Sequence, residues 1–244
     1  MQNNIFTKII LLLFVLSSSS SHSSASECVV FIHGYAKGGF CFVKLKNFFE
    51  ENGFRAIVPE YPALQNQYNI TELAETFVVP NLKKEITNCR KVHFVGFSLG
   101  GVITRYILDK HRPDNLGRVV FIASPSCGYD FLRQDLLGFF LRKTLGPVID
   151  DLKNNSTFFE RIKKPSDYEF GIISGCVSLN PFSFSHRNKC LTDGIVFYKN
   201  IQIQGAMDYV TINSSHLHIL YNVATMEECY SFITTGKFRY KHQN

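Results

Sequence analysis

The sequence predicts an α/β fold with a mostly parallel central sheet and helices on both faces. Short apolar runs alternate with segments of helical periodicity from about residue 28 to residue 235. The apolar runs are continuous, as expected for strands that are buried on both faces. The mature part contains no repeat or linker, so we expect a single domain at 26–244.

The expected elements follow a regular order of strand and helix. The expected strands lie at 29–32, 54–58, 92–95, 119–123, 170–174 and 209–212, and the expected helices at 40–52, 71–87, 99–110 and 226–235. Gly53 stands where glycine commonly ends a helix, and Pro80 interrupts the second helix because it lacks a backbone donor. Crossovers between the parallel strands are expected to be right-handed.

The first 25 residues have the order of a secretory signal peptide. Lys8 is their only charged residue, an apolar run follows at 9–16, and small residues precede a cleavage point at or near Ala25. The apolar run is short for a membrane anchor, which needs roughly 20 residues. We therefore predict a signal peptide at 1–25 and a secreted protein, either extracellular or periplasmic.

The charge of the chain does not indicate a nucleic-acid partner. The formal net charge is +6, or +5 after loss of Lys8 with the signal peptide (+6 − 1). Lysine and arginine recur singly or in pairs and form no basic stripe interleaved with aromatic residues. An ordinary solvated surface fits this distribution, and transient contact with a lipid or membrane surface stays open as the alternative.

All seven cysteines lie in the mature part of the chain. Export to an oxidising compartment would allow some of them to pair, and the odd number leaves at least one without a partner in the chain. No Cys-x-x-Cys occurs, so the spacing does not predict a zinc site. Cys176 and Cys190 bracket a loop and are the expected bridge.

Residues 96–100 have the pattern Gly-x-Ser-x-Gly between an expected strand and an expected helix. This context predicts a nucleophile elbow, a sharp turn that holds the hydroxyl of Ser98 above the edge of the sheet. Small residues are needed on both sides because the strand and helix backbones pass close together. The helix N-terminus would favour developing negative charge. The alternative is a tight turn with a solvated serine.

A serine hydroxyl is a weak nucleophile and needs a base. His216 follows the last expected strand, in a loop at the carboxyl edge of the sheet where active-site loops gather. His218 is the alternative, but its position also suits the start of the next helix. The base is therefore assigned to His216.

The acid of such a site follows the serine and precedes the histidine along the chain. Asp193 lies in a loop after the strand at 170–174, where it would accept the imidazole N–H and orient the ring. Asp208 is the competitor, but it is expected at the start of the last strand and hence at the opposite edge. The acid is assigned to Asp193, with a turn-forming Asp-Gly pair as the alternative.

Two backbone N–H groups are expected to form an oxyanion hole. One belongs to Leu99, directly after the nucleophile, and the other to Tyr35, in the loop after the first strand. His33 is expected to shape this loop by hydrogen bonding rather than to act as a base. The chemistry requires no metal and no organic cofactor.

The region 129–165 is longer than a simple connection between strands requires. Its part at 131–149 is rich in leucine and phenylalanine. A core helix and an apolar lid, or a wall of an acyl-chain groove, fit the same residues.

These stretches together resemble small α/β-hydrolase lipases of the bacterial triacylglycerol-lipase type, which are related to deacylases of inositol-linked lipid anchors. The resemblance rests on 30–34, 96–101, 124–128 and the stretch 193–216 with Gly-Ala at 205–206. It covers roughly 28–235 and is weakest at 129–190. The separation of 23 positions from Asp193 to His216 (216 − 193) matches the family register, which supports this pair over Asp208 and His218.

The resemblance implies an α/β-hydrolase fold and a lipase or esterase that cleaves carboxylic esters of lipid-like substrates through an acyl-enzyme. The family has a small or simple aliphatic residue after His-Gly, whereas this chain has Tyr35. A narrower opening near the oxyanion hole is therefore expected, which bears on the size of the substrate. An acyltransferase or thioesterase on the same triad is one alternative. A secreted binding module without turnover is the other.

Overall fold

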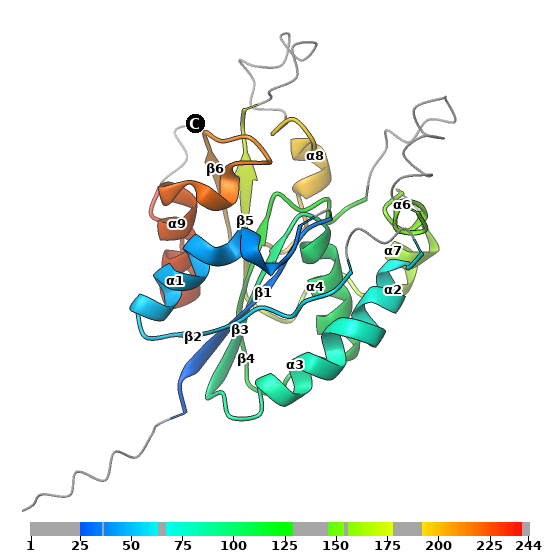
Figure 1. Ribbon diagram of the computed structural model, residues 1–244. Coiled ribbons are helices and arrows are strands. Elements are labelled where there is room, and N and C mark those ends of the chain that lie inside the picture. Colours follow the sequence, from blue (N-terminus) through cyan, green and yellow to red (C-terminus); the bar gives the residue numbers. More distant parts are fainter. Residues whose placement is uncertain are drawn as a thin grey trace, which may run out of the picture.

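The computed structural model describes residues 25–35, 37–62, 67–128, 146–153, 156–177 and 192–240. They contain a six-stranded sheet with the order β2-β1-β3-β4-β5-β6, in which every pair of neighbours is parallel (Figure 1). The predicted class, a parallel sheet covered by helices on both faces, is confirmed. The predicted signal peptide at 1–25 lies almost wholly outside the described residues.

The six strands coincide with the six expected apolar runs. Their bounds are Glu27–Ile32 for β1, Arg55–Ile57 for β2, Lys91–Phe97 for β3, Leu116–Ile122 for β4, Phe170–Gly175 for β5 and Asp208–Ile212 for β6. β2 is shorter than expected and lies at one edge of the sheet. β3 runs two residues further than expected, to Phe97, and so leads directly into the Ser98 turn.

The helices lie in two layers. α1 (Val43–Glu51), preceded by the 3₁₀ turn η1 (Gly39–Phe42), and α9 (Val223–Thr235) cover one face. On the other face lie α2 (Ile70–Leu73), α3 (Val79–Glu85) and α4 (Leu99–Lys110). The shorter elements are α6 (Val148–Asp151), α7 (Thr157–Arg161), α8 (Tyr198–Ile201) and the 3₁₀ turn η4 (Ile219–Tyr221).

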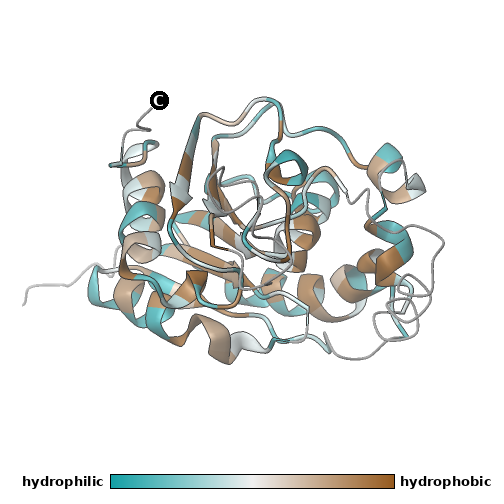
Figure 2. Cartoon of the chain, turned by 90° about the horizontal axis from the view of Figure 1, so that it is seen from above, coloured by the Kyte–Doolittle hydropathy of each residue, from teal (hydrophilic) through white to brown (hydrophobic). Residues whose placement is uncertain are grey.

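Each face of the sheet has its own hydrophobic core. Val29 and Phe31 of β1 pack with α1 and α9, whereas Val30 and Ile32 pack with α4. This alternation follows from the two-residue period of a strand. Hydrophobic colour accordingly runs along the strands between the two helical layers in Figure 2.

Pro80 does not break the helix in which the sequence places it. A π-helical turn, η2 (Ala74–Val78), joins α2 to α3, and Pro80 lies in the first turn of α3. A proline is tolerated there because the N–H that it lacks is not needed in the first turn. The predicted interruption is therefore a change of helical pitch just before the proline.

The described parts of the proposed lid region pack into the core. Val148, Phe158 and Ile162 are buried among residues of the α4 side of the sheet. A core role therefore fits α6 and α7. The remaining parts of the region, 129–145 and 154–155, lie outside the described residues, so the predicted lid is not tested there. None of the helices within the described ranges is long and apolar enough to cross a membrane.

A disulfide that the sequence analysis missed ties the start of β1 to the segment before β3. It joins Cys28 and Cys89, which are separated by 61 positions. Cys176 is also disulfide-bonded, and Cys190, its predicted partner, lies outside the described residues. The free thiols among the described cysteines are Cys41, Cys127 and Cys229.

Replacing both Cys28 and Cys89 with alanine should lower the free energy of unfolding by about 4 kcal/mol, because closing a loop of 61 residues restricts the unfolded chain. Urea denaturation of the two proteins would measure this difference. Cys127→Ala, which removes an exposed free thiol, is the matched control and should change stability little. Equal stability of the double variant and the wild type would contradict the prediction.

Candidate active site

Ser98 lies in the sharp turn between β3 and α4. Its backbone has φ 52° and ψ −124°, a conformation that non-glycine residues rarely adopt. The Ser98 N–H donates to the Ile122 carbonyl at 2.9 Å, and the Ser98 carbonyl accepts from the Gly101 N–H at 3.0 Å. These bonds hold the strained turn in place, as expected for a nucleophile elbow.

The glycines around Ser98 are required by close backbone contacts. A Cβ at position 96 would lie 2.5 Å from the Cα of Gly101. A Cβ at position 100 would collide with the backbone carbonyl oxygens of Ile32 and His33. The glycine pattern therefore allows α4 to pack directly against β3 and against the end of β1.

A continuous chain of hydrogen bonds joins Ser98, His216 and Asp193. The Ser98 Oγ lies 3.0 Å from His216 Nε2, and His216 Nδ1 lies 2.7 Å from Asp193 Oδ2. Because a carboxylate only accepts hydrogen bonds, Nδ1 donates to it, and Nε2 is left to accept the serine proton. The structure thus brings together the three predicted catalytic residues from three different loops.

The carboxylate of Asp193 is held by the turn that follows it. Its Oδ1 accepts the N–H of Ile195 at 3.0 Å and that of Val196 at 2.7 Å. The Asp193 carbonyl accepts the backbone N–H of His216 at 3.0 Å, so the acid and base loops are also joined through their backbones. Only 1% of Asp193 is exposed, and these donors compensate its burial.

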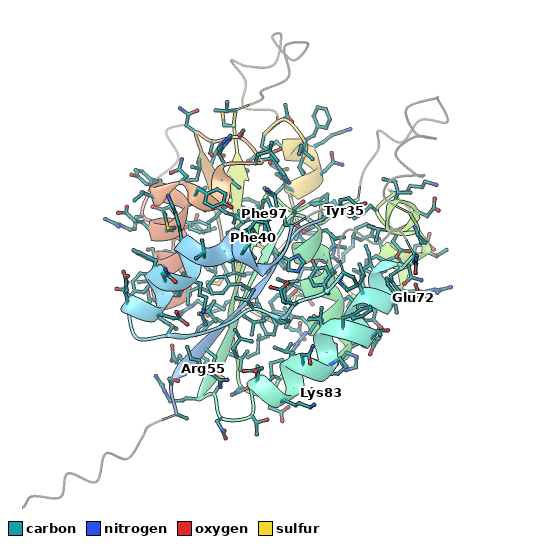
Figure 3. All side chains as sticks on the ribbon, viewed as in Figure 1. Tyr35, Phe40, Arg55, Glu72, Lys83 and Phe97 are labelled. Carbon is teal, nitrogen blue, oxygen red and sulfur yellow. A yellow bond between two sulfur atoms is a disulfide. The ribbon has the colours of Figure 1, made fainter. Side chains whose placement is uncertain are left out.

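His216 is largely shielded from water. Its ring lies 5.0 Å from that of Phe97, and the residue is 6% exposed. Figure 3 labels Phe97, Tyr35 and Phe40 near one another at the upper ends of β1 and β3, whereas Arg55 and Lys83 lie toward the opposite end. The candidate site is therefore at the carboxyl edge of the sheet, as predicted.

The two competing residues lie elsewhere. Asp208 is the first residue of β6, and its carboxylate accepts the backbone N–H groups of Tyr209 and Phe238. His218 is exposed, precedes η4 and has its Nδ1 2.9 Å from Ser215 Oγ. Neither of the two takes part in the hydrogen-bond chain of Ser98.

The two predicted oxyanion donors come from the residue after the nucleophile, Leu99, and from the loop after β1, which carries Tyr35. Leu99 is the first residue of α4, with its side chain buried. The loop of Tyr35 lies against the elbow, because a Cβ at position 34 would be 3.0 Å from Ser98 Cβ. Tyr35 itself packs against the core on the α4 side. The role of its N–H as an oxyanion donor stays a prediction.

The sequence analysis missed two residues that contact this loop, Glu60 and Tyr61. They follow β2, and Tyr61 is buried against His33. Their signal in the sequence is their position after a strand, at the carboxyl edge. His33 itself is buried, with Nδ1 3.1 Å from the Gly34 carbonyl, as expected for a residue that shapes the loop.

Within the described ranges, no three His, Cys, Asp or Glu residues form a group that could hold a metal ion.

A nucleophile elbow between a strand of a mostly parallel sheet and the helix that follows it is characteristic of the α/β-hydrolase class of proteins. A family model described as alpha/beta hydrolase fold matches residues 27–161, more than half of the chain. The chain therefore belongs to the alpha/beta hydrolase family.

A curated relative is methylesterase 8 of Arabidopsis thaliana, which is 28% identical over 120 residues. The match covers 47% of this chain and 44% of the relative, so it spans less than half the length of that protein.

Solved structures share the fold at low sequence identity. The mature lipase of Bacillus licheniformis is 17% identical with a TM-score of 0.63, over 86% of this chain and 91% of that chain. A carboxyl esterase from a metagenome is 17% identical with a TM-score of 0.62, over 80% of this chain and 66% of that chain.

Burial lowers the pKa of His33 from its ordinary value of 6.5, although the Gly34 carbonyl and Glu60 act in the opposite direction. The unfolded chain then binds more protons than the folded protein just below pH 6.5, so this contribution to stability is present above that pH and is lost as the pH falls.

We therefore expect the difference in unfolding free energy between the wild type and His33→Gln to shrink from pH 8 to pH 5. Urea denaturation at each pH would measure it. Both proteins share every other titrating group, so the difference isolates His33. A difference that is constant across this range would contradict the prediction.

Proposed function

We propose that this protein is a serine hydrolase that cleaves carboxylic esters. The observation that carries the proposal is the unbroken hydrogen-bond chain from Asp193 through His216 to Ser98. Membership of the alpha/beta hydrolase family supports it, as do relatives named as esterases and lipases. The expected enzyme is a lipase or esterase.

The proposed reaction has two acyl-transfer steps. His216 takes the proton of the Ser98 hydroxyl as the oxygen attacks the ester carbonyl, and the resulting imidazolium is stabilised by Asp193. His216 then gives this proton to the leaving alcohol as the ester C–O bond breaks, which leaves an acyl group on Ser98. Water, activated by His216, hydrolyses the acyl-enzyme and releases the acid.

The oxyanion of each tetrahedral intermediate would be held by the N–H groups of Tyr35 and Leu99. Loss of one such donor typically costs roughly 3–4 kcal/mol of transition-state stabilisation. The strained backbone at Ser98 and the close packing of Gly34 on its Cβ support this arrangement. The proposed chemistry needs no metal and no organic cofactor.

A lipid-like substrate is the finer form of the proposal. Apolar side chains are exposed directly beside the candidate site: Phe40 is 70% exposed, Ile195 47% and Leu217 48%. Phe40 follows the Tyr35 loop, and the other two follow Asp193 and His216. Such a rim suits an acyl chain or transient contact with a lipid surface. The likeness to deacylases of inositol-linked lipid anchors is its narrowest form and rests on the sequence stretches alone.

Secretion is also proposed. The signal-peptide pattern at 1–25 supports it, and so do the disulfides at Cys28–Cys89 and at Cys176, because disulfides persist in oxidising compartments. The N-terminal residue of the exported chain tests this proposal. Residue 26, or one close to it, is expected, and an exported chain that still begins at Met1 would argue against cleavage.

The mature protein should react covalently with a fluorophosphonate serine probe. Ser98→Ala and His216→Asn should abolish labelling, and Asp193→Asn should slow it by about 10⁴-fold, because the imidazole would lose its orienting partner. Measuring the labelling rate would test these expectations.

Asp208→Asn and His218→Asn are matched controls that make the same chemical changes outside the hydrogen-bond chain, and both should label at the wild-type rate. A folded wild type that remains unlabelled, even with detergent, would favour the binding module.

The rate on p-nitrophenyl esters should rise from acetate to octanoate if the apolar rim receives the acyl chain. A buried CH₂ is worth about 0.8 kcal/mol, so kcat/KM should rise by up to about 15-fold for each pair of carbons that the rim buries. Preference for acetate would contradict the proposal of a lipid-like substrate.

Two further assays distinguish the hydrolase from an acyltransferase and from a thioesterase. With added methanol, an acyltransferase would form mainly the methyl ester. Given a matched ester and thioester, a thioesterase would prefer the thioester.

A further inference from the structure

The loop that carries the predicted oxyanion donor is anchored by residues that follow another strand. Tyr61 lies beyond β2, and its ring stacks on that of His33 with 3.9 Å between centroids and 5° between planes. The Tyr61 hydroxyl donates a hydrogen bond to the His33 carbonyl. Tyr61 is 6% exposed, so this bond is made inside the protein.

Glu60 holds the far end of the same loop. Its carboxylate oxygens accept the Gly39 N–H at 3.0 and 3.2 Å, at the start of η1. A Cβ at position 39 would come within 2.7 Å of Val58 and would also collide with Glu60, so glycine allows this close approach. Two consecutive residues thus hold the loop at His33 and at Gly39.

The His33 carbonyl that accepts the Tyr61 hydroxyl lies beside the nucleophile elbow. The His33 carbonyl oxygen also packs against Gly100 of the elbow, where any Cβ would collide with it. Gly34, the next residue, lies against Ser98. The backbone that leads to the Tyr35 N–H is therefore held between Tyr61 on one side and the elbow on the other.

The Tyr61 hydroxyl is suited to this structural bond and not to proton transfer. Burial raises its pKa well above the ordinary value, so it stays protonated and remains a donor. Its partner is a backbone carbonyl and not a group of the Ser98 chain.

We propose that Tyr61 is a positioning residue, which fixes the backbone of His33 and Gly34 so that the Tyr35 N–H meets the oxyanion. This inference rests on the proposed ester hydrolysis. A misplaced donor weakens binding of the tetrahedral state and leaves binding of the ground-state ester nearly unchanged. Loss of the Tyr61 hydrogen bond should therefore lower kcat and leave KM nearly unchanged.

Tyr61→Phe in the full mature chain tests the proposal, because it keeps the stacked ring and removes the hydroxyl. With p-nitrophenyl butyrate, kcat should fall by about tenfold or more while KM changes less than about twofold. Affinity for an alkyl trifluoromethyl ketone, which forms a tetrahedral oxyanion on serine, should fall by the same factor as kcat/KM.

Tyr209→Phe is the matched control. The Tyr209 hydroxyl donates to the Ile203 carbonyl at 2.7 Å, so this variant loses the same kind of bond outside the candidate site. It should keep the wild-type kcat and ketone affinity. If Tyr61→Phe does not fold, Glu60→Gln provides the test, since the Glu60 side chain is 68% exposed and its change should lower kcat without raising KM.

The outcomes separate the two proposals. An active wild type with a Tyr61→Phe variant of unchanged kcat and ketone affinity would overturn the inference alone. A Tyr61→Phe variant in which a higher KM accounts for the whole fall in kcat/KM, with kcat unchanged, would do the same. Such a result would indicate a role in ground-state binding. A wild type with neither turnover nor probe labelling would overturn the proposed function and this inference with it.

Discussion

The contact between the nucleophile elbow and the end of β1 is the constraint on which the rest of the site depends. β1 and β3 are neighbours in the sheet, so the loop after β1 and the turn after β3 leave the same edge side by side. Gly100 lets the helix N-terminus touch the carbonyl oxygens of Ile32 and His33. Because this contact is made by backbone atoms, it fixes where an oxyanion donor can lie relative to Ser98, whatever side chains surround it.

The predicted acid and base depend on a similar arrangement at the same carboxyl edge, on the side of β5 and β6. β5 and β6 are adjacent, and the loops that follow them carry Asp193 and His216. The backbone bond from the His216 N–H to the Asp193 carbonyl joins these loops before the side chains meet. Gly175, at the end of β5, leaves room for Asp193 and for the Ser214 carbonyl. The orientation of the imidazole is thus built into the backbone as well as into the carboxylate.

Several polar side chains around the candidate site, some buried and some exposed, make structural hydrogen bonds outside the Ser98 chain. Tyr61 and Glu60 hold the loop after β1, and the buried Arg105 of α4 donates to the carbonyls of Ser126 and Lys163, beyond β4. Each ties a loop at the carboxyl edge to a neighbouring element. Loss of the partner of Tyr61 or Arg105 would leave a buried polar group unsatisfied, at a cost of about 1–3 kcal/mol. The loops around Ser98 are thus held in part by residues outside its hydrogen-bond chain.

The sequence by itself predicted the six strands, the helix after Ser98 and catalytic roles for Ser98, His216 and Asp193. It could do so because apolar runs and glycines at a sharp turn are local patterns, and because the order of the three residues along the chain can be read directly. Only the tertiary structure decided that Cys28 pairs with Cys89 and that Tyr61 anchors His33. It also showed that Pro80 lies in the first turn of α3, directly after a π-helical turn. The two long-range contacts join residues 61 and 28 positions apart, and only the order of strands in the sheet brings such residues together.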